Sequence, residues 1–243
     1  RDLLSSFFSA IGDAMLVVIG WVLALAPIGV AALAFVVAAR TGAGAIGVFL
    51  HYILIVASVG MIVWAAAYPL GIIGGRRSPM MFVRAVLPAQ AVAISTQSSL
   101  ASLPAMLRGA KMLGVRETTA DVTLPLAVAL FRSTGPAMNL AVAIYVAYLT
   151  GVELTPTTLA IGVAVAATTT LGAVSLPGSI SFISSIAPIA LAMGVPIEPL
   201  ALLVAVETLP DIIRTLGNVS NDVAAAATVD ARAGETAREE SVH

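Results

Sequence analysis

Six polar residues near the C-terminal end of the chain recur at helical spacing within a very apolar sequence. At about 100° per residue they share one face of a helix: Glu207, Asp211, Arg214, Thr215, Asn218 and Asp222. A charged group at membrane depth costs at least about 2.5–3.5 kcal/mol, so such groups face a protein interior or a solute pathway. The carboxylates and the guanidinium of this face could bind a charged solute. The alternative is a buried structural ion pair between Asp211 and Arg214.

The composition indicates an integral, multi-pass membrane protein. Of its 243 residues, 59% are hydrophobic and 10% are charged, and the mean hydropathy is +1.03, whereas soluble domains carry about 25% charged residues. The sequence lacks the alternating pattern of an outer-membrane barrel, so the spans in the lipid bilayer are expected to be helices. A net charge of −1 without a basic patch predicts no nucleic-acid partner, and the absence of cysteine excludes disulfides and thiolate chemistry.

Six apolar segments are positioned to carry this polar face. They run at roughly 3–39, 44–73, 80–107, 119–150, 156–193 and 196–228, and four of them fit one membrane span each. The third and the fifth are interrupted by small polar residues and by Ser-Leu-Pro at 102–104 and 175–177. Because proline removes a backbone donor, a non-helical tip is expected there. We predict two re-entrant helical hairpins, at about 78–113 and 156–193; a kinked spanning helix is the alternative for each.

Each predicted hairpin is followed by a helix with a polar centre, at 131–136 and at 211–222. Paired broken segments in corresponding positions indicate a transporter built from an inverted repeat. The positive-inside rule supports this topology, because basic residues flank the first hairpin on both sides and recur after residue 230. The predicted fold is therefore an all-α membrane protein with an inverted repeat of two re-entrant helical hairpins and two partly unwound transmembrane helices, plus two further spans.

The last helix and the two hairpin tips resemble the C-terminal portion of the glutamate transporter family, the dicarboxylate/amino acid:cation symporters. The resemblance covers residues from about 3 to 229. It implies a homotrimer in the plasma (inner) membrane of a prokaryote, with hairpin tips that gate the site. It also implies a scaffold-type transmembrane helix at 1–43, a transport domain at 44–229 and a cytoplasmic tail at 230–243.

The resemblance assigns roles in the last helix. Asp211 would bind the substrate amino group, and Arg214 would bind the side-chain carboxylate of an acidic amino acid. Thr215 and Asn218 would contribute to substrate binding, and Asn218 and Asp222 to a cation site. A planar guanidinium matches a carboxylate, and a carboxylate accepts hydrogen bonds from an ammonium group.

The two hairpin tips and the fourth span would complete the substrate site by the same resemblance. In the first tip, the serine run of the family aligns with Ser98, Ser99 and Leu100, where Leu100 replaces a serine. The second tip and the fourth span would contribute four further residues: Leu176, Pro177, Gly178 and Gly135.

The fourth span departs from the family pattern. Phe131-Arg132-Ser133-Thr134-Gly135 stands where the family has Asn-Met-Asp-Gly-Thr, so oxygen ligands for a hard cation are lost. We expect the cation site, formed by Arg132, Ser133, Asn218 and Asp222, to carry a fixed positive charge in place of a bound cation. In the alternatives, Arg132 points toward an interface, or a one-residue shift restores another oxygen ligand.

These observations predict a secondary active transporter of an acidic or related small amino acid, working by alternating access. Sodium coupling would be altered, with Na⁺ or H⁺ as the coupling ion and no other metal or cofactor. An enzyme is not expected, because no serine is paired with a base and no cluster of His or Cys could ligate a metal. The alternatives are a C4-dicarboxylate symporter and a channel-like or non-transporting relative.

Overall fold

The computed structural model describes residues 17, 21, 28, 32, 35, 44–172 and 179–240. The chain divides into two compact units, Arg1–Gly47 and Val48–His243, and the following description concerns the second. Its described residues form helices and no strand, as predicted. The scaffold-type helix predicted at 1–43 lies almost entirely outside the described residues, as does the second hairpin tip with Leu176, Pro177 and Gly178.

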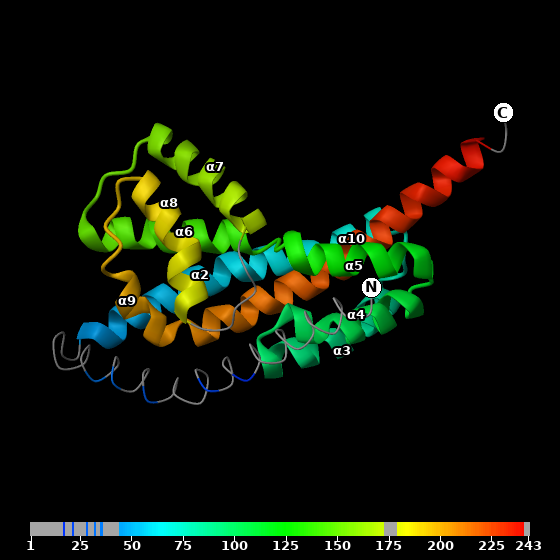
Figure 1. Cartoon of the computed structure of the whole chain (residues 1–243), viewed down its shortest axis with the longest axis horizontal. Helices are drawn as coiled ribbons and strands as arrows, with labels where there is room; N and C mark the ends of the chain where they lie inside the picture. The colour runs from blue at the N-terminus through cyan, green and yellow to red at the C-terminus, as the bar shows by residue number, and fades with distance from the viewer. Residues whose placement is uncertain are drawn as a thin grey trace, which may run out of the picture. The chain divides into compact units, whose positions relative to one another are not determined.

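The helices follow one another with short connections (Figure 1). In order they are α2 (Gly44–Pro69), a π-helical turn (Leu70–Gly74), α3 (Pro79–Thr96), α4 (Ser99–Met112), α5 (Glu117–Leu130), α6 (Gly135–Thr150), α7 (Pro156–Gly172), α8 (Ser179–Ala192), α9 (Leu200–Leu203), a 3₁₀ turn (Val204–Val206) and α10 (Thr208–Glu240). Three helical segments are long and apolar enough to cross a membrane, Ile46–Gly74, Pro79–Thr96 and Glu117–Thr150.

Helices α3 and α4 pack against each other as a helical hairpin within the predicted range. The chain reverses where Gln97 adopts a left-handed conformation with φ 50° and Ser98 caps α4 by accepting a hydrogen bond from the Ala101 amide at 3.2 Å. The sequence-based explanation of this tip was wrong in one respect, because Pro104 lies inside α4. Gly109 brings the two helices close together, since a Cβ there would collide with the Ala85 carbonyl oxygen.

The fourth span is interrupted as expected, but the last helix is not. Residues 131–134 separate α5 from α6, whereas α10 runs without interruption through the whole polar face at 211–222. The irregular part lies just before α10, at the 3₁₀ turn and at Glu207, the first residue of the polar face. The helix stays wound where its polar side chains find partners on other segments: Asn218 Oδ1, for example, accepts a hydrogen bond of 2.7 Å from the Thr134 hydroxyl.

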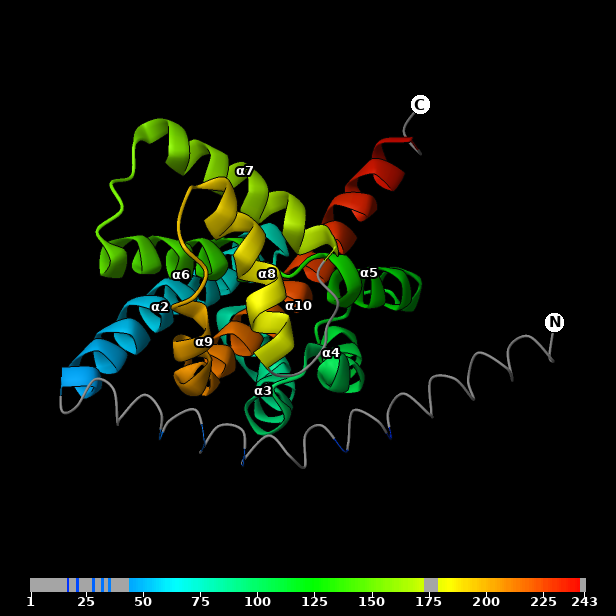
Figure 2. The same cartoon turned by 60° about the vertical axis from the view of Figure 1, so that its left-hand side comes forward.

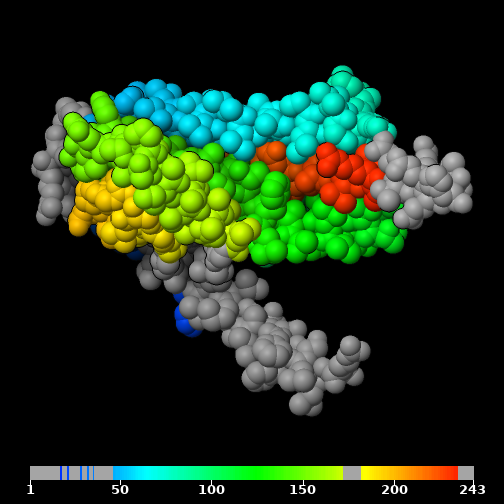
Figure 3. Space-filling view, turned by 90° about the horizontal axis from the view of Figure 1, so that it is seen from above, coloured from blue at the N-terminus to red at the C-terminus, as the bar shows by residue number. Residues whose placement is uncertain are grey.

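Two hydrophobic cores lie along α2 and α10. We call α3, α4, α5 and the adjoining part of α10 the first lobe; its core includes Phe82, Met106 and Leu124. The second lobe consists of α6, α7, α8 and α9, and its core includes Met138 and Ile186. Figure 2 shows α7 and α8 packed together over α6, and Figure 3 shows the second lobe at one end of α2 and the first at the other. The polar face of α10 passes between these two cores.

Candidate functional site

Arg214 lies near the middle of the polar face of α10 and is held by two carboxylates. Its Nη2 atom is 2.8 Å from Glu207 Oε1, and its Nη1 atom is 3.2 Å from Asp211 Oδ1. On its other side, Glu207 Oε2 accepts a hydrogen bond of 2.6 Å from the Tyr52 hydroxyl on α2. We call Tyr52, Glu207, Asp211 and Arg214 the Arg214 cluster. It contains the predicted Asp211–Arg214 pair, but it extends beyond that pair to a second acid and to another helix.

The interruption of the fourth span is fixed to α10 beside this cluster. The Thr134 hydroxyl lies 2.7 Å from Asn218 Oδ1 and 3.0 Å from the Arg214 carbonyl oxygen, and the Thr134 amide donates to Asn218 Oδ1 at 3.1 Å. Gly217 permits this approach, since a Cβ there would collide with Thr134 Cγ2. The Asn218 side-chain oxygen, predicted to bind substrate and cation, therefore accepts hydrogen bonds from the protein itself.

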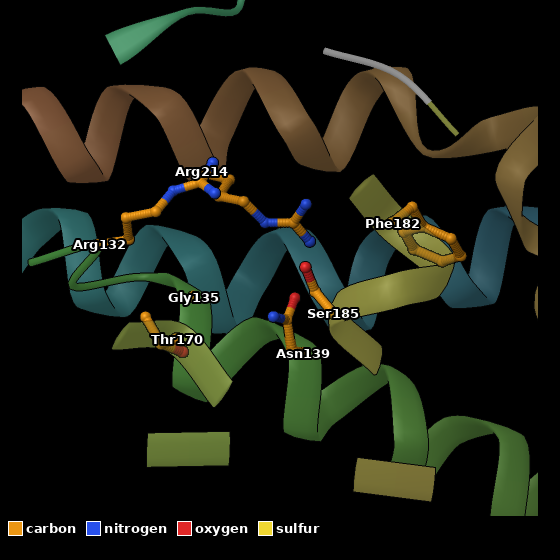
Figure 4. A pocket seen from close by; sticks show the side chains of 7 residues that line it. All are labelled: Arg132, Gly135, Asn139, Thr170, Phe182, Ser185 and Arg214. Carbon is orange, nitrogen blue, oxygen red and sulfur yellow. The ribbon is translucent and has the colours of Figure 1, made fainter. Parts of the chain in front are cut away.

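A cavity opens between α10 and the second lobe (Figure 4). Its volume, counted as the space open to the centre of a water-sized sphere, is about 20 Å³, and its wall is formed by Arg132, Gly135, Asn139, Thr170, Phe182, Ser185 and Arg214. In Figure 4 the side chain of Arg132 runs from the α5–α6 connection toward α10, and the polar ends of Asn139 and Ser185 point toward the Arg214 guanidinium. The wall thus carries two guanidinium groups and no carboxylate.

The structure brings only some of the predicted substrate-binding residues to this cavity. Gly135 and Arg214 line it, and Asp211 adjoins it through its ion pair with Arg214. The Thr215 hydroxyl donates to the Asp211 carbonyl oxygen at 2.9 Å, so it is directed to its own helix. At the tip of the α3–α4 hairpin, outside the cavity wall, lie Ser98, Ser99 and Leu100.

The predicted cation site contains oxygens that lack hydrogen-bond partners. Asp222 is 1% exposed, and neither its Oδ1 atom nor the buried Ser133 Oγ atom has a hydrogen-bond partner. The charges of Asp211 and Asp222 act on Arg132. Among the residues that the structure describes, however, Arg132 forms no ion pair or hydrogen bond with either carboxylate. The interruption of the fourth span therefore brings an unpaired guanidinium and a buried carboxyl group with an unpartnered oxygen near each other.

Several residues of this region were not singled out from the sequence. Tyr52 and Thr134 contact partners 155 and 84 residues away in the chain, and nothing local indicates such pairing. Asn139 did carry a signal, because it is an amide within the apolar part of a predicted span. Ser185 lies among small polar residues of the second predicted hairpin and has no distinguishing spacing.

Comparisons of the sequence with known proteins identify its relatives. The sequence model described as the sodium:dicarboxylate symporter family matches residues 1–232. The human Neutral amino acid transporter A is 26% identical over 228 residues, which cover 89% of this chain and 41% of that protein. The Proton/sodium-glutamate symport protein of Bacillus subtilis is 28% identical over 228 residues, covering 91% of this chain and 51% of that protein.

A third relative matches a shorter stretch. The Serine/threonine transporter SstT of Streptococcus agalactiae is 30% identical over 132 residues, covering 54% of this chain and 32% of that protein. The chain spans about two fifths of the first relatives it matches, with coverage of 41% and 40% of their lengths.

Proposed function

The chain belongs to the sodium:dicarboxylate symporter family, and on this basis we propose that it forms the substrate-binding part of a secondary active transporter for an acidic or related small amino acid. Members of this family are transporters, not enzymes. The observation that carries the proposal is the buried Arg214, held by two carboxylates beside a cavity that has a second guanidinium in its wall.

The Arg214 cluster has the charges that an acidic amino acid needs. Arg214 and Asp211 form an ion pair of 3.2 Å, and the Asp211 side chain is 30% exposed whereas that of Glu207 is 11% exposed. A substrate could open the more accessible pair, placing its ammonium on Asp211 and its carboxylate on Arg214. Both buried charges would then stay compensated, which avoids the large penalty of an unpaired buried ion. Glu207 would remain on Arg214 and keep it oriented.

A C4-dicarboxylate symporter is the second candidate, and the absence of a carboxylate from the cavity wall favours it. A dicarboxylate has no ammonium group to engage Asp211. Asp211→Asn should therefore leave succinate transport intact if succinate is the substrate, and should abolish aspartate transport if aspartate is. Flux of both radiolabelled compounds into proteoliposomes, compared between the wild type and this variant, separates the two candidates.

We further propose that sodium coupling is altered, with Na⁺ or H⁺ as the coupling ion. Arg132 brings a fixed positive charge to the region of Asp222, where the family has a motif without arginine. Against this, the unpartnered oxygens of Ser133 and Asp222 are atoms that a hard cation could bind. The dependence of substrate binding on sodium decides between these possibilities.

The remaining features of the family are proposals for this chain as well. We propose that the α3–α4 and α7–α8 hairpins are re-entrant gates related by an inverted repeat, and that residues 44–229 form the transport domain. Residues 1–43 would contribute a scaffold helix and residues 230–243 a cytoplasmic tail. The whole protein would be a homotrimer in the plasma membrane of a prokaryote; similarity to human and Bacillus subtilis transporters shows only membership of a membrane transporter family.

The first test is calorimetric binding of L-aspartate to the purified full-length protein, at zero and at high sodium with the ionic strength held constant. Tight binding without sodium supports an acidic amino acid transporter in which Arg132 replaces a coupling cation. Binding that requires sodium supports the substrate assignment and rejects altered coupling. No binding of L-aspartate under either condition rejects the substrate assignment.

A further inference from the structure

We propose that Arg132 is a carboxylate-binding residue of the cavity, and that its guanidinium receives a substrate carboxylate that Arg214 alone cannot hold. This inference rests on the proposed function, because it names the group that binds the anion in the same site. It differs from the assignment of Arg132 as a substitute for a cation, since it gives the side chain direct contact with substrate.

The first argument is the unequal occupation of the two guanidiniums. Both terminal nitrogens of Arg214 face acids, Glu207 just before α10 at 2.8 Å and Asp211 on α10 at 3.2 Å. Arg132, in contrast, has no ion pair or hydrogen bond among the described residues, although it is only partly exposed. Arginine offers five donors in a planar fork that matches a carboxylate. Arg132 therefore offers a guanidinium without any partner in the part of the chain that the structure describes, whereas the free donors of Arg214, on Nε and Nη2, belong to a group that two carboxylates already neutralise.

The second argument is the potential of the cavity itself. Helix α6 begins at Gly135, so the positive end of its dipole lies at the same wall as Arg132. Gly135 leaves little room for a side chain there, since a Cβ would lie 3.2 Å from Thr170 Cγ2. The other polar groups of the wall, on Asn139 and Ser185, are neutral. An anion placed between the two guanidiniums would reduce their mutual repulsion, adding to the charges of Asp211 and Asp222, which lie outside the wall and act on Arg132.

The third argument is the position of Arg132 relative to the acids nearby. If its role were only to neutralise Asp222, an ion pair between them would be expected, but Asp222 Oδ1 has no hydrogen-bond partner and no ion pair joins these two described residues. In Figure 4 the Arg132 side chain runs from the α5–α6 connection toward α10, and Arg132 is part of the cavity wall. A substrate carboxylate in the cavity could therefore reach this unpaired guanidinium.

The test uses Arg132→Gln and Arg132→Lys in the purified full-length protein, with Arg108→Gln as the control. Arg108 is exposed on α4 and lies outside the cavity wall, so it matches the change in charge without changing the site. Binding of L-aspartate is measured by calorimetry at zero and at high sodium, and the thermal unfolding midpoint is measured without ligand.

Loss of a charge-assisted contact predicts that Arg132→Gln weakens L-aspartate binding by at least about tenfold at both sodium concentrations. Arg132→Lys should recover part of the affinity, and Arg108→Gln should leave it within about twofold. The unfolding midpoint of Arg132→Gln without ligand should equal or exceed that of the wild type, because the variant removes an unpaired, partly buried charge. A residue with a structural role would lower it.

Three results would overturn the inference. These are unchanged aspartate affinity in Arg132→Gln, a loss of affinity that high sodium fully restores, and a loss accompanied by a lower unfolding midpoint in the absence of ligand. In each case the wild type still binds L-aspartate, so the proposed function stands. A wild-type protein that binds no L-aspartate instead rejects the proposed function, and the inference with it.

Discussion

Two clusters of ion pairs lie along the C-terminal part of the chain, and their compositions are opposite. Near residue 214 one guanidinium is held by two carboxylates, and near residue 230 one carboxylate is held by two guanidiniums. The first arrangement is buried and borders a cavity, whereas the second lies at the end of the first lobe, where it joins α10 to two loops. Comparing them separates ionic contacts that hold the fold from those that can bind a solute.

The cluster around Asp230 has the properties of a structural contact that connects α10 to two loops. Asp230 Oδ1 accepts hydrogen bonds from Arg116 Nε at 2.7 Å and from the Arg116 amide at 3.2 Å, and its Oδ2 accepts one from Arg77 Nη2 at 3.2 Å. The Arg116 side chain is 49% exposed, so water can solvate the excess positive charge. Although Arg77 Nε lacks a partner, both oxygens of the carboxylate are bonded.

The Arg214 cluster leaves more of its bonding capacity unused. Arg214 Nε has no hydrogen-bond partner, and the contact of Arg214 Nη2 with Glu207 Oε1 is an ion pair of 2.8 Å that is not a hydrogen bond. Beside the cluster, Ser133 Oγ and Asp222 Oδ1 also lack partners. Buried polar atoms without partners cost stability, and functional sites are where a fold retains them. The two clusters both contain ion pairs, so ion pairs alone do not identify the binding site. The number of buried polar atoms without hydrogen-bond partners distinguishes the site from the structural contact at Asp230.

The largest loss of stability and of binding is expected for a substitution of Arg214. Arg214→Gln leaves Glu207 and Asp211 without their cation, and breaking a buried ion pair in this way costs about 3–5 kcal/mol. We expect a strongly lowered free energy of unfolding and no detectable binding of L-aspartate, measured by denaturation and calorimetry in detergent. The double variant Arg214→Gln/Glu207→Gln removes one of the uncompensated charges. It should regain stability but not binding; if it regains neither, the buried charges are not the cause.

A smaller effect, confined to stability, is expected at Asp230. Asp230→Asn keeps the shape of the side chain but weakens charge-assisted hydrogen bonds to two arginines, one of them half exposed, so we expect a loss of about 1–2 kcal/mol. L-Aspartate affinity should remain within about twofold of the wild type. Reduced affinity at unchanged stability would show that this cluster belongs to the binding machinery and would remove the distinction between the two clusters.

The sequence predicted the parts of the fold that depend on local chemistry. The apolar runs predicted the helical segments. The first hairpin was expected over a range that includes α3 and α4, and the motif at 131–134 was expected to interrupt the fourth span. The pair Asp211–Arg214 could be predicted because residues three apart lie on the same helical face. These are consequences of residue type and spacing alone.

The contacts that complete the site depend on tertiary packing and were not predictable in this way. Glu207 bonds Tyr52 on α2, and Asn218 bonds Thr134; each pair is brought together only by the packed helices. The polar face of α10 suggested an unwound helix, but side chains of α10 find partners on α2, on α3 and at Thr134, and it stays helical. Pro104 suggested a break, but it falls within α4, after a turn set by Gln97 and Ser98.

The same substitution at two tyrosines tests whether the Arg214 cluster differs from the first lobe. Tyr52 donates to Glu207 in the Arg214 cluster, and Tyr68 is bonded to Gln90 in the first lobe at 3.2 Å. Removal of either hydroxyl should lower the free energy of unfolding by about 1 kcal/mol. We expect Tyr52→Phe also to weaken L-aspartate binding several-fold, because Glu207 would be less constrained beside Arg214, whereas Tyr68→Phe should leave binding unchanged. Equal effects of both variants on affinity would contradict a special role for Tyr52.

The smallest expected effect is the acid sensitivity of the Asp230 cluster. Burial alone would raise the pKa of Asp230, but the hydrogen bonds and the charge of Arg116 outweigh burial and hold this pKa below its ordinary value. A carboxyl group whose pKa is lower in the folded state stabilises the fold above its unfolded pKa of about 3.9, and this contribution is lost as the pH falls through the folded pKa.

Asparagine does not titrate, so the difference in unfolding midpoint between the wild type and Asp230→Asn isolates this one group from the other acids. The difference should be constant from pH 7 to about pH 5 and should shrink as the pH falls below about 4; a difference that is independent of pH would mean that the stabilisation at residue 230 does not come from its charge.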